Sequence, residues 1–354
     1  MTAITNITTL YRGRDALPLR TRLLWMFGAV AALHAAAVVL LLAGGAGNAG
    51  GTGALAVTGG LVLTAYLAGV KHSYDWDHLA AIDNSTRKFV ASRQDPVSVG
   101  FAFSLGHSSV VTLAGVLVIA GAAAIGEFMQ DGSTGNVVLG LIGNGVSGLF
   151  LLAMGLFNGS AFARSAQAYR RARSGAAIDP QDLQPTGLVA RLLARPLARV
   201  RRPRSIYVIG FLFGLGFDTA TTIGLLMMTT AASLAGVPPI ALLALPLAFT
   251  AAMTLCDSLN GMAMMRMYRS ALDDPQRKLG FNALVTGISA VSALFIAVIT
   301  LGGFVNAAFA LDDPLTVWLG SVDLGDAGLL LVALLLAVWG AAALKVRLGC
   351  GSQR

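Results

Sequence analysis

The residues best suited to chemistry lie in one short polar stretch, Lys71–Lys88, which reads KHSYDWDHLAAIDNSTRK. It holds three aspartates, an asparagine and two of the chain's four histidines, and it follows an apolar run, Leu55–Val70. Imidazole and carboxylate groups together bind first-row divalent ions such as Ni²⁺, Co²⁺ and Zn²⁺. The whole chain is 56% hydrophobic and only 12% charged. So many metal ligands in so apolar a chain predict a metal site inside a membrane transport protein.

The apolar runs around this stretch are long enough to cross a membrane. A hydrocarbon core requires about 20 residues of helix, and lipid offers no hydrogen-bond partner to an irregular backbone. The sequence therefore predicts an all-α integral membrane protein with eight transmembrane helices. The eight runs are Leu23–Ala43, Leu55–Ile82, Val97–Ile125, Val137–Ala161, Ile206–Ala232, Pro238–Met265, Phe281–Ala308 and Asp326–Leu344.

The positive charges alternate with these runs. All of the 25 Lys and Arg residues except Lys71 lie in segments that an eight-span chain places on one side. By the positive-inside rule, the N- and C-termini are predicted to be cytoplasmic. A nucleic-acid-binding surface would not alternate in this way, so the net charge of +8 does not indicate nucleic acid as a partner. The segments on the other side carry only acids, namely Glu127, Asp131, Asp312, Asp313 and Asp323.

A basic segment, 164–204, divides the chain into two halves of four spans, 1–163 and 205–354. We expect this segment to hold short helices that lie on anionic lipid. The halves share one short echo, a Phe-x-Phe-x-Leu-Gly frame in Phe101–Ser109 and Phe211–Thr219. Internal repeats are common in transporters, although nine residues are weak evidence for one.

Polar residues on four different spans fall at similar depths. At 1.5 Å per residue from the cytoplasmic boundary, His78 and Asp257 lie roughly 14 Å deep, His107 roughly 15 Å and Asp218 roughly 18 Å. Each is costly in the membrane interior unless it is paired, hydrated or bound to an ion. One shared site is the simplest arrangement that satisfies all four.

The second span is too long for one straight crossing. From Gly53 to Thr86 there are 34 residues, which as a helix would extend roughly 51 Å across a core of about 30 Å. The span is therefore steeply tilted, broken near Gly69, or extended into the cytoplasm. On an unbroken helix, His72, Asp75 and His78 would share one face, whereas Asp77 would point about 100° away from His78.

The motifs resemble those of the nickel/cobalt transporter (NiCoT) permeases. KHSYDWDH is similar to that family's His-x4-Asp-His signature in the second span, and AIDNSTRK is similar to the segment after it. FSLGHSSVV, GLGFDTAT and LCDSLNG are similar to its motifs in the third, fifth and sixth spans. Lys71, Ser73, Trp76, Thr222 and Asn260 depart from the family pattern, and the last two remove negative charges.

This resemblance implies a single-component permease that brings Ni²⁺ or Co²⁺ into a bacterial cytoplasm through the inner membrane. The ion would be the transported substrate, with no other cofactor. The resemblance names Asp77 as the signature acid, which reaches both histidines only if the helix unwinds between Val70 and Asp77. We therefore predict a broken helix with Asp77, rather than Asp75, at the metal. The implied ligands are His72, Asp77, His78, His107, Asp218 and Asp257.

Several alternatives remain open on the sequence alone. An exporter of the same ions is disfavoured because the central segment lacks a histidine-rich tract. A membrane metalloenzyme would require more histidine clusters than four histidines can form, so we predict that the chain is not an enzyme. A haem-binding electron carrier fits badly with the acids beside His78. The sequence shows no nucleotide-binding P-loop and thus indicates no ATPase subunit.

Overall fold

The chain is helical throughout the part that the structure describes. The structure is a computed structural model, which describes residues 17–46, 51–120 except 93 and 95, 133–174, 200, 202–215, 220–270 and 275–322. No strand occurs in these residues. The all-α class predicted from the sequence is therefore confirmed for the described part.

Five helices are long and apolar enough to cross a membrane. They belong to α2 (Leu19–Ala46), α5 (Val99–Ile119), α7 (Thr134–Arg173), the consecutive α11 (Pro239–Leu242) and α12 (Ala244–Ser270), and α13 (Pro275–Phe309). These correspond to the predicted first, third, fourth, sixth and seventh spans. The predicted eighth span lies outside the described residues, so a total of eight spans stays a prediction.

The second span is broken between Val70 and Asp77, as predicted, but not at Gly69. It forms α3 (Gly51–Ser73) and α4 (Trp76–Ala91), with Tyr74 and an extended Asp75 between them. Gly69 lies inside α3 and has a different role from the one predicted. A Cβ at this position would overlap the backbone carbonyl of Phe249, so Gly69 allows α3 to lie directly against α12.

The fifth span is also divided into two helices. They are α9 (Pro203–Gly214) and α10 (Ala220–Leu234), and residues 216–219 between them lie outside the description. The described part of the second echoing stretch, 211–215, lies beside the first, because α5 and α9 pack with their backbones in contact. Gly210 lies against the carbonyl of Phe103, and Gly214 lies against His107. The two helices therefore run parallel at this contact.

Two features differ from the sequence-based expectation. Helix α7 continues to Arg173, so the first ten residues of the predicted 164–204 segment are helical. The Ala and Arg residues of this part have high helix propensity.

A short helix, α14 (Pro314–Ser321), was not predicted, although its start carries the usual signals of a helix N-terminus. Asp313 caps this helix by accepting from the Leu315 and Thr316 N–H groups, and the Thr316 hydroxyl and N–H lower the pKa of Asp313.

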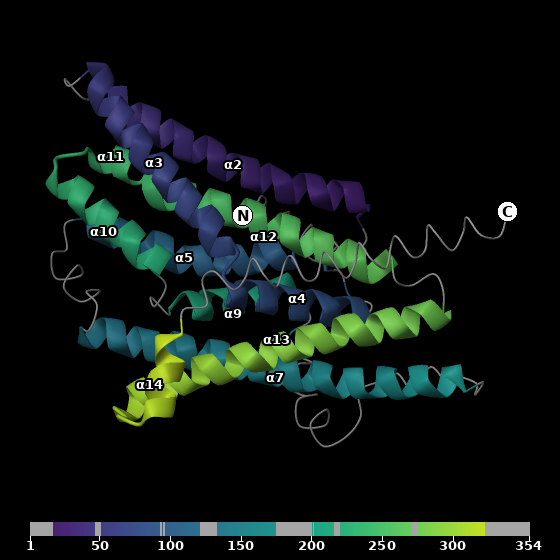
Figure 1. Ribbon diagram of the computed structural model, residues 1–354. Coiled ribbons are helices and arrows are strands. Elements are labelled where there is room, and N and C mark those ends of the chain that lie inside the picture. The colour runs from purple at the N-terminus through teal and green to yellow at the C-terminus, as the bar shows by residue number, and fades with distance from the viewer. Residues whose placement is uncertain are drawn as a thin grey trace, which may run out of the picture.

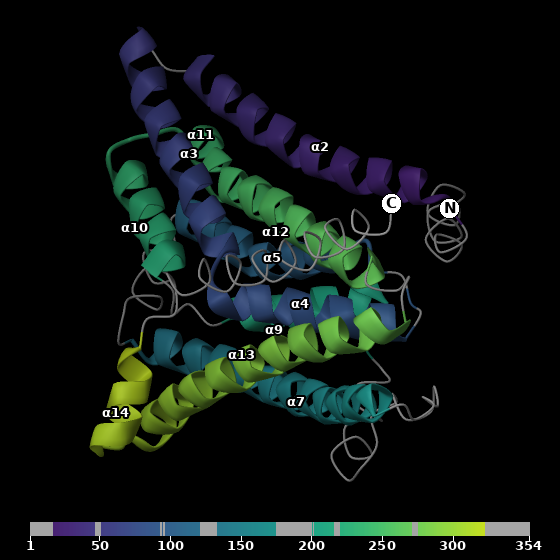
Figure 2. The same ribbon diagram turned by 45° about the vertical axis from the view of Figure 1, so that its right-hand side comes forward.

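The helices form two groups with α4 between them (Figures 1 and 2). Helices α2, α3, α5 and α12 lie on one side, with α9 packed on α5, and α7 and α13 pack along each other on the other side. Helix α4 contacts members of both groups, α12 and α5 as well as α13 and α7. The short helix that follows the break is thus at the centre of the molecule.

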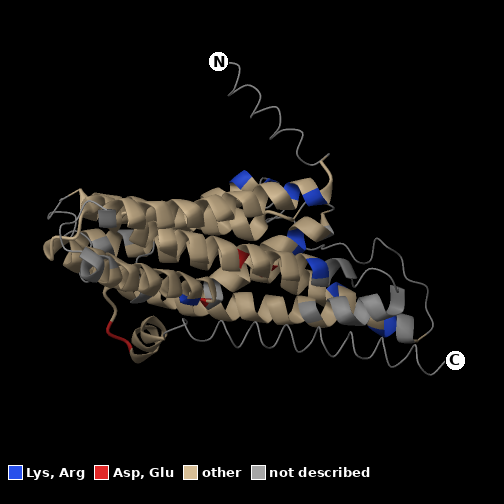
Figure 3. Ribbon diagram, turned by 90° about the horizontal axis from the view of Figure 1, so that it is seen from above, with Lys and Arg blue, Asp and Glu red and all other residues tan. Residues whose placement is uncertain are grey.

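The charged residues mark the two ends of the helices. Lys and Arg gather mostly toward one end, and the acidic segment before α14 lies at the other end (Figure 3). This separation agrees with the alternation in the sequence and leaves the membrane-facing middle of the bundle largely free of exposed charge.

The topology can be tested with single cysteines in a background that lacks Cys256 and Cys350. Asp312 is exposed and does not cap α14, so Asp312→Cys preserves the local fold; Arg171 is exposed near the end of α7. We expect a membrane-impermeant maleimide added to intact cells to label Asp312→Cys and to miss Arg171→Cys. If only Arg171→Cys were labelled, the orientation of the chain in the membrane would be the reverse of the predicted one.

Candidate metal centre

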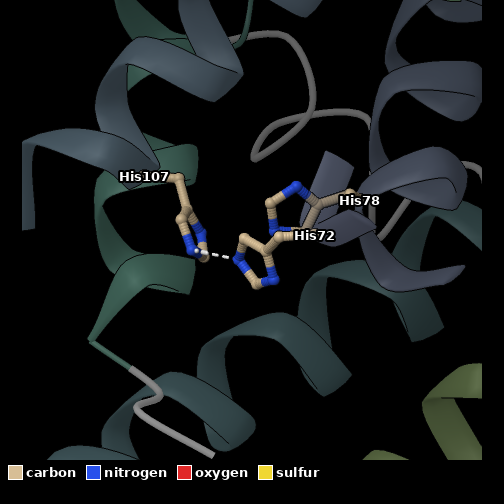
Figure 4. A group of neighbouring side chains, drawn as sticks. All are labelled: His72, His78 and His107. Atoms are coloured by element: carbon tan, nitrogen blue, oxygen red, sulfur yellow. Dashed lines mark hydrogen bonds between the residues drawn. The ribbon is translucent and has the colours of Figure 1, made fainter. Parts of the chain in front are cut away.

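Three histidines from three helices converge at the break in the second span. His72 lies in the last turn of α3, His78 in the first turn of α4, and His107 in the middle of α5. Figure 4 shows their rings turned toward one another. The Nε2 atoms of His72 and His107 are 2.9 Å apart, and the His78 ring centroid lies 4.6 Å and 4.5 Å from the other two.

This histidine cluster is closed to solvent. His72, His78 and His107 are 1%, 0% and 4% exposed. The Nδ1 atom of His107 is buried and has no hydrogen-bond partner among the described residues. A buried polar nitrogen without full hydrogen bonding is costly. A cluster that binds a cation would keep such nitrogen atoms, because they can serve as its ligands.

Asp75 fixes the orientation of His72. It occupies the N-cap position of α4, yet its side chain makes no cap hydrogen bond. Instead its Oδ2 accepts a hydrogen bond from His72 Nδ1 at 2.6 Å. This bond holds the Nδ1 proton, so the Nε2 lone pair of neutral His72 is directed into the cluster.

Asp257 supplies a negative charge from α12. Its carboxylate is completely buried, and Oδ2 lies 3.7 Å from Nδ1 of His78. That distance is too long for a hydrogen bond, but it places a carboxylate close to any cation that His78 binds. Two carboxylates, Asp75 and Asp257, thus flank three imidazoles, which gives the site the charge needed to stabilise a divalent cation.

The spacing of the nitrogen atoms fits a first-row ion after a small contraction. Zn²⁺–imidazole bonds are about 2.0–2.1 Å long, so two ligands at a right angle lie roughly 2.9 Å apart. The His72 and His107 Nε2 atoms already meet this spacing. One nitrogen from each histidine lies within 4.8 Å of the others, so a small inward movement of His78 would complete a three-imidazole site.

Aromatic rings close the cluster on two sides. The Phe249 ring lies 5.5 Å from the His72 ring, and the Phe103 ring lies 5.0 Å from the His78 ring. Each phenylalanine belongs to a separate apolar cluster of the core, and the histidines lie between the two. The Phe249 cluster comprises Ala65, Val111, Leu225, Leu245, Phe249, Met253 and neighbours; the Phe103 cluster comprises Leu79, Ile82, Phe103, Ile206, Phe213, Ile296 and neighbours.

The predicted ligands are placed unevenly by the structure. His72, His78, His107 and Asp257 come together, and Asp75 contacts His72. The side chain of Asp77 and the whole of Asp218 lie outside the described residues, so their assignment stays a prediction. The chain leading to Asp218 does run past the site, because Gly214 packs against His107.

Two other polar residues take no part in the cluster. His107 bonds to His72 and not to Ser104, whose hydroxyl has no hydrogen-bond partner among the described residues. His34 bonds instead to the Val30 carbonyl and the Tyr66 hydroxyl.

Sequence reasoning missed the aromatic walls. Phe103 lies four residues before His107, so it shares a helix face with this histidine, and that spacing was available in the sequence. Phe249 carried no such signal. Its position beside His72 follows from the close contact of α3 and α12 at Gly69, which only the fold reveals.

The fold and the site define a multi-pass helical membrane protein with a buried polyhistidine centre. Residues 58–345 match the family described as high-affinity nickel-transport protein, NicO. The chain belongs to this family, which confirms the relationship indicated by the motifs. No solved structure matches the chain significantly.

Relatives that carry names cover most of the chain. It is 39% identical over 299 residues to the nickel transporter NicT of Mycobacterium tuberculosis, covering 83% of this chain and 80% of the relative. It is 36% identical over 322 residues to the high-affinity nickel-transport protein NixA of Helicobacter pylori, covering 88% and 93%. It is 38% identical over 283 residues to the cobalt transport protein NhlF of Rhodococcus rhodochrous, covering 78% and 79%.

The role of Asp75 can be tested by removing its charge. Asp75→Asn retains the shape of the side chain but weakens its hold on His72, so we expect the Ni²⁺ affinity of the purified protein to fall about 10–100-fold. Equilibrium dialysis with radioactive nickel measures the affinity, and nickel X-ray absorption should show a smaller imidazole contribution. Normal affinity in Asp75→Asn together with its loss in Asp77→Asn would instead support Asp77 as the essential acid.

Proposed function

We propose that this protein takes up Ni²⁺ or Co²⁺ across the bacterial cytoplasmic membrane as a single-component secondary permease. The observation that carries the proposal is the buried cluster of His72, His78 and His107, located between helices of a chain from the high-affinity nickel-transport family. Named relatives include nickel transporters and a cobalt transporter, so both ions are proposed as substrates.

The proposed site contains three imidazoles and nearby carboxylates. His72, His78 and His107 bind the ion, Asp75 orients His72, and Asp257 balances charge next to His78. Asp77 and Asp218 complete the proposed set from the sequence. Nitrogen ligands with few carboxylates favour Ni²⁺, Co²⁺ and Zn²⁺ over Mg²⁺ or Ca²⁺, which prefer oxygen.

The proposed topology has eight spans with both termini in the cytoplasm. The distribution of Lys and Arg supports this orientation (Figure 3). The membrane potential is then a sufficient source of energy. It is worth about 2.3 kcal/mol per charge per 100 mV, so a dication gains roughly 4.6 kcal/mol, enough for about a thousandfold accumulation.

Export is the second candidate direction, and the sequence of the central segment argues against it. Segment 164–204 contains no histidine, although a cytoplasmic histidine-rich tract would be useful for collecting ions for export. An enzymatic role is less well supported, because the family comprises transport proteins.

Replacement of single histidines tests the function. In cells that lack other nickel and cobalt uptake, the chain should raise accumulation of trace Ni²⁺ or Co²⁺. His72→Ala, His78→Ala or His107→Ala should each reduce this uptake to the level of empty cells, because two imidazoles remain where three are required.

His34→Ala is the matched control. His34 is also a histidine on a membrane helix, but it bonds to Val30 and Tyr66 and not to the cluster. We expect His34→Ala to retain uptake at an unchanged level of protein in the membrane. If the unmodified chain lowered metal accumulation below that of empty cells, the protein would be an exporter. If a variant that lacks all three cluster histidines still took up the metal, this site would be ruled out.

A further inference from the structure

The helices on the two sides of α4 are each held together by closely packed glycines. In the first group, α3, α5, α9 and α12 touch backbone to backbone. A Cβ at Gly69 would overlap the carbonyl of Phe249, one at Gly100 that of Asp257, and one at Gly106 that of Tyr207. Helices in direct backbone contact of this kind have interlocking surfaces and cannot easily slide. We call α2, α3, α5, α9 and α12 the core group.

The second group consists of α7, α13 and α14. Gly148 and Gly155 of α7 lie tightly against Leu301 and Leu294 of α13, where a Cβ would come within 2.7 Å and 2.8 Å of their side chains. Gly302 of α13 packs against Leu319 of α14 in the same way. We call these helices the side group. It packs against α9 of the core group through side chains such as Phe150 on Phe213, with ring centroids 5.9 Å apart.

Helix α4 is attached to the side group by polar side chains. Arg87 donates to the hydroxyls of Thr286 and Ser289 on α13, the latter at 2.9 Å, and the Asn158 side chain of α7 donates to the side-chain oxygen Oδ1 of Asn84. Hydrogen bonds between helices are effective in the membrane interior, because no water replaces a broken partner. The C-terminal end of α4 also bonds through Lys88 to the Val200 carbonyl, in the connection before α9.

The contact of α4 with the core group is of a different kind. Toward α5 and α12 it presents Ile82, which lies over the crossing of Gly100 and Gly261. A Cβ at Gly261 would be 3.7 Å from the Ile82 side chain, which is ordinary van der Waals contact, and 3.1 Å from the Gly100 nitrogen. At this crossing the contact is van der Waals packing of Ile82 on the glycine backbones.

The boundary between α4 and the core group also divides the metal site. His72, His107 and Asp257 stand on core-group helices, whereas His78 stands on α4. The chain between His72 and His78 is the non-helical Tyr74–Asp75 link, which can change its backbone angles at little cost. An ion bound by all three histidines would therefore join α4 to the core group.

We propose that α4 moves as one unit with α7, α13 and α14 against the core group, with Tyr74–Asp75 as the hinge. The inference rests on the proposed function, for which it supplies the moving part. When α4 separates, His78 leaves the other two histidines and Ile82 leaves the Gly100–Gly261 crossing, one helical turn beyond His78. Both the ion's third ligand and the apolar barrier beside it are thus removed by one motion. Asn84 and Arg87 are the residues that transmit it.

Disulfide cross-linking tests which contacts must open. The background carries Cys256→Ser and Cys350→Ser. One pair, Ile82→Cys with Gly261→Cys, joins α4 to the core group. A second pair, Asn84→Cys with Asn158→Cys, joins α4 to the side group, and a third, Thr112→Cys with Thr250→Cys, lies within the core group, where the two hydroxyls are 3.0 Å apart.

Oxidation with iodine should affect the pairs differently. We expect cross-linked Ile82→Cys/Gly261→Cys to lose at least about tenfold in nickel uptake and to recover with dithiothreitol, because a required domain motion is blocked. The reduced second pair lacks the Asn84–Asn158 bond and should transport slowly, as Asn158→Ala does. Once oxidised, the second and third pairs should transport within about twofold of the unmodified protein, because each disulfide joins helices that move together. Full uptake by the cross-linked first pair, or reversible loss in the second, would overturn the proposal.

A second measurement covers the case in which Gly261→Cys does not fold. Asn158→Ala removes the bond to Asn84; we expect uptake to fall about tenfold while equilibrium Ni²⁺ binding stays within about twofold, because coupling and not ligation is lost. Asn144→Ala, on the same helix away from α4, is the control and should transport normally. Normal uptake in Asn158→Ala would contradict the coupling. Absence of metal uptake and binding in the unmodified protein would instead refute the proposed function itself.

Discussion

Three imidazoles and a carboxylate, buried where neither water nor lipid offers hydrogen bonds, set the constraint on which the rest of this fold depends. Polar groups in such a place must be satisfied by one another or by a bound ion. His72 bonds to Asp75 and His107, and Asp257 faces His78. These groups come from four helices, α3, α4, α5 and α12, so the packing of these helices decides whether the buried polar groups meet. The site therefore helps to specify the packing around it.

The break in the second span follows from that constraint. On a continuous helix, His72 and His78 would be separated by roughly 9 Å along the axis and about 120° around it. Their ring centroids are in fact 4.6 Å apart. Ending α3 at Ser73 and starting α4 at Trp76 brings the second histidine back toward the first, and it also lets Asp75 turn toward His72 in place of capping α4.

The sequence could predict the parts of this structure that depend on local composition. Apolar length identified the long helices, and excess length identified a broken second span. Estimated depth placed His78, His107 and Asp257 at one level, and the structure has them adjacent. The break lies in the predicted interval Val70–Asp77, but its assignment to Gly69 was wrong, because glycine serves equally for a kink and for close packing. Gly69 serves for packing against Phe249. Helix α14 and the extension of α7 depend on end signals that apolar length does not detect.

The composition of α4 is explained by its two different neighbours. Asp83, Asn84, Ser85, Thr86 and Lys88 are all buried, although a helix enclosed on every side would be more stable with apolar residues. Its hydrogen bonds through Asn84 and Arg87 select α7 and α13 as permanent partners, since breaking them in an apolar interior is costly. Toward α5 and α12, helix α4 presents Ile82 and His78. A bound ion can strengthen this contact, and opening the contact exposes no backbone group. An apolar contact at Ile82, next to the polar contacts of Asn84 and Arg87, is the arrangement that would let α4 leave α5 and α12 while it stays bound to α7 and α13.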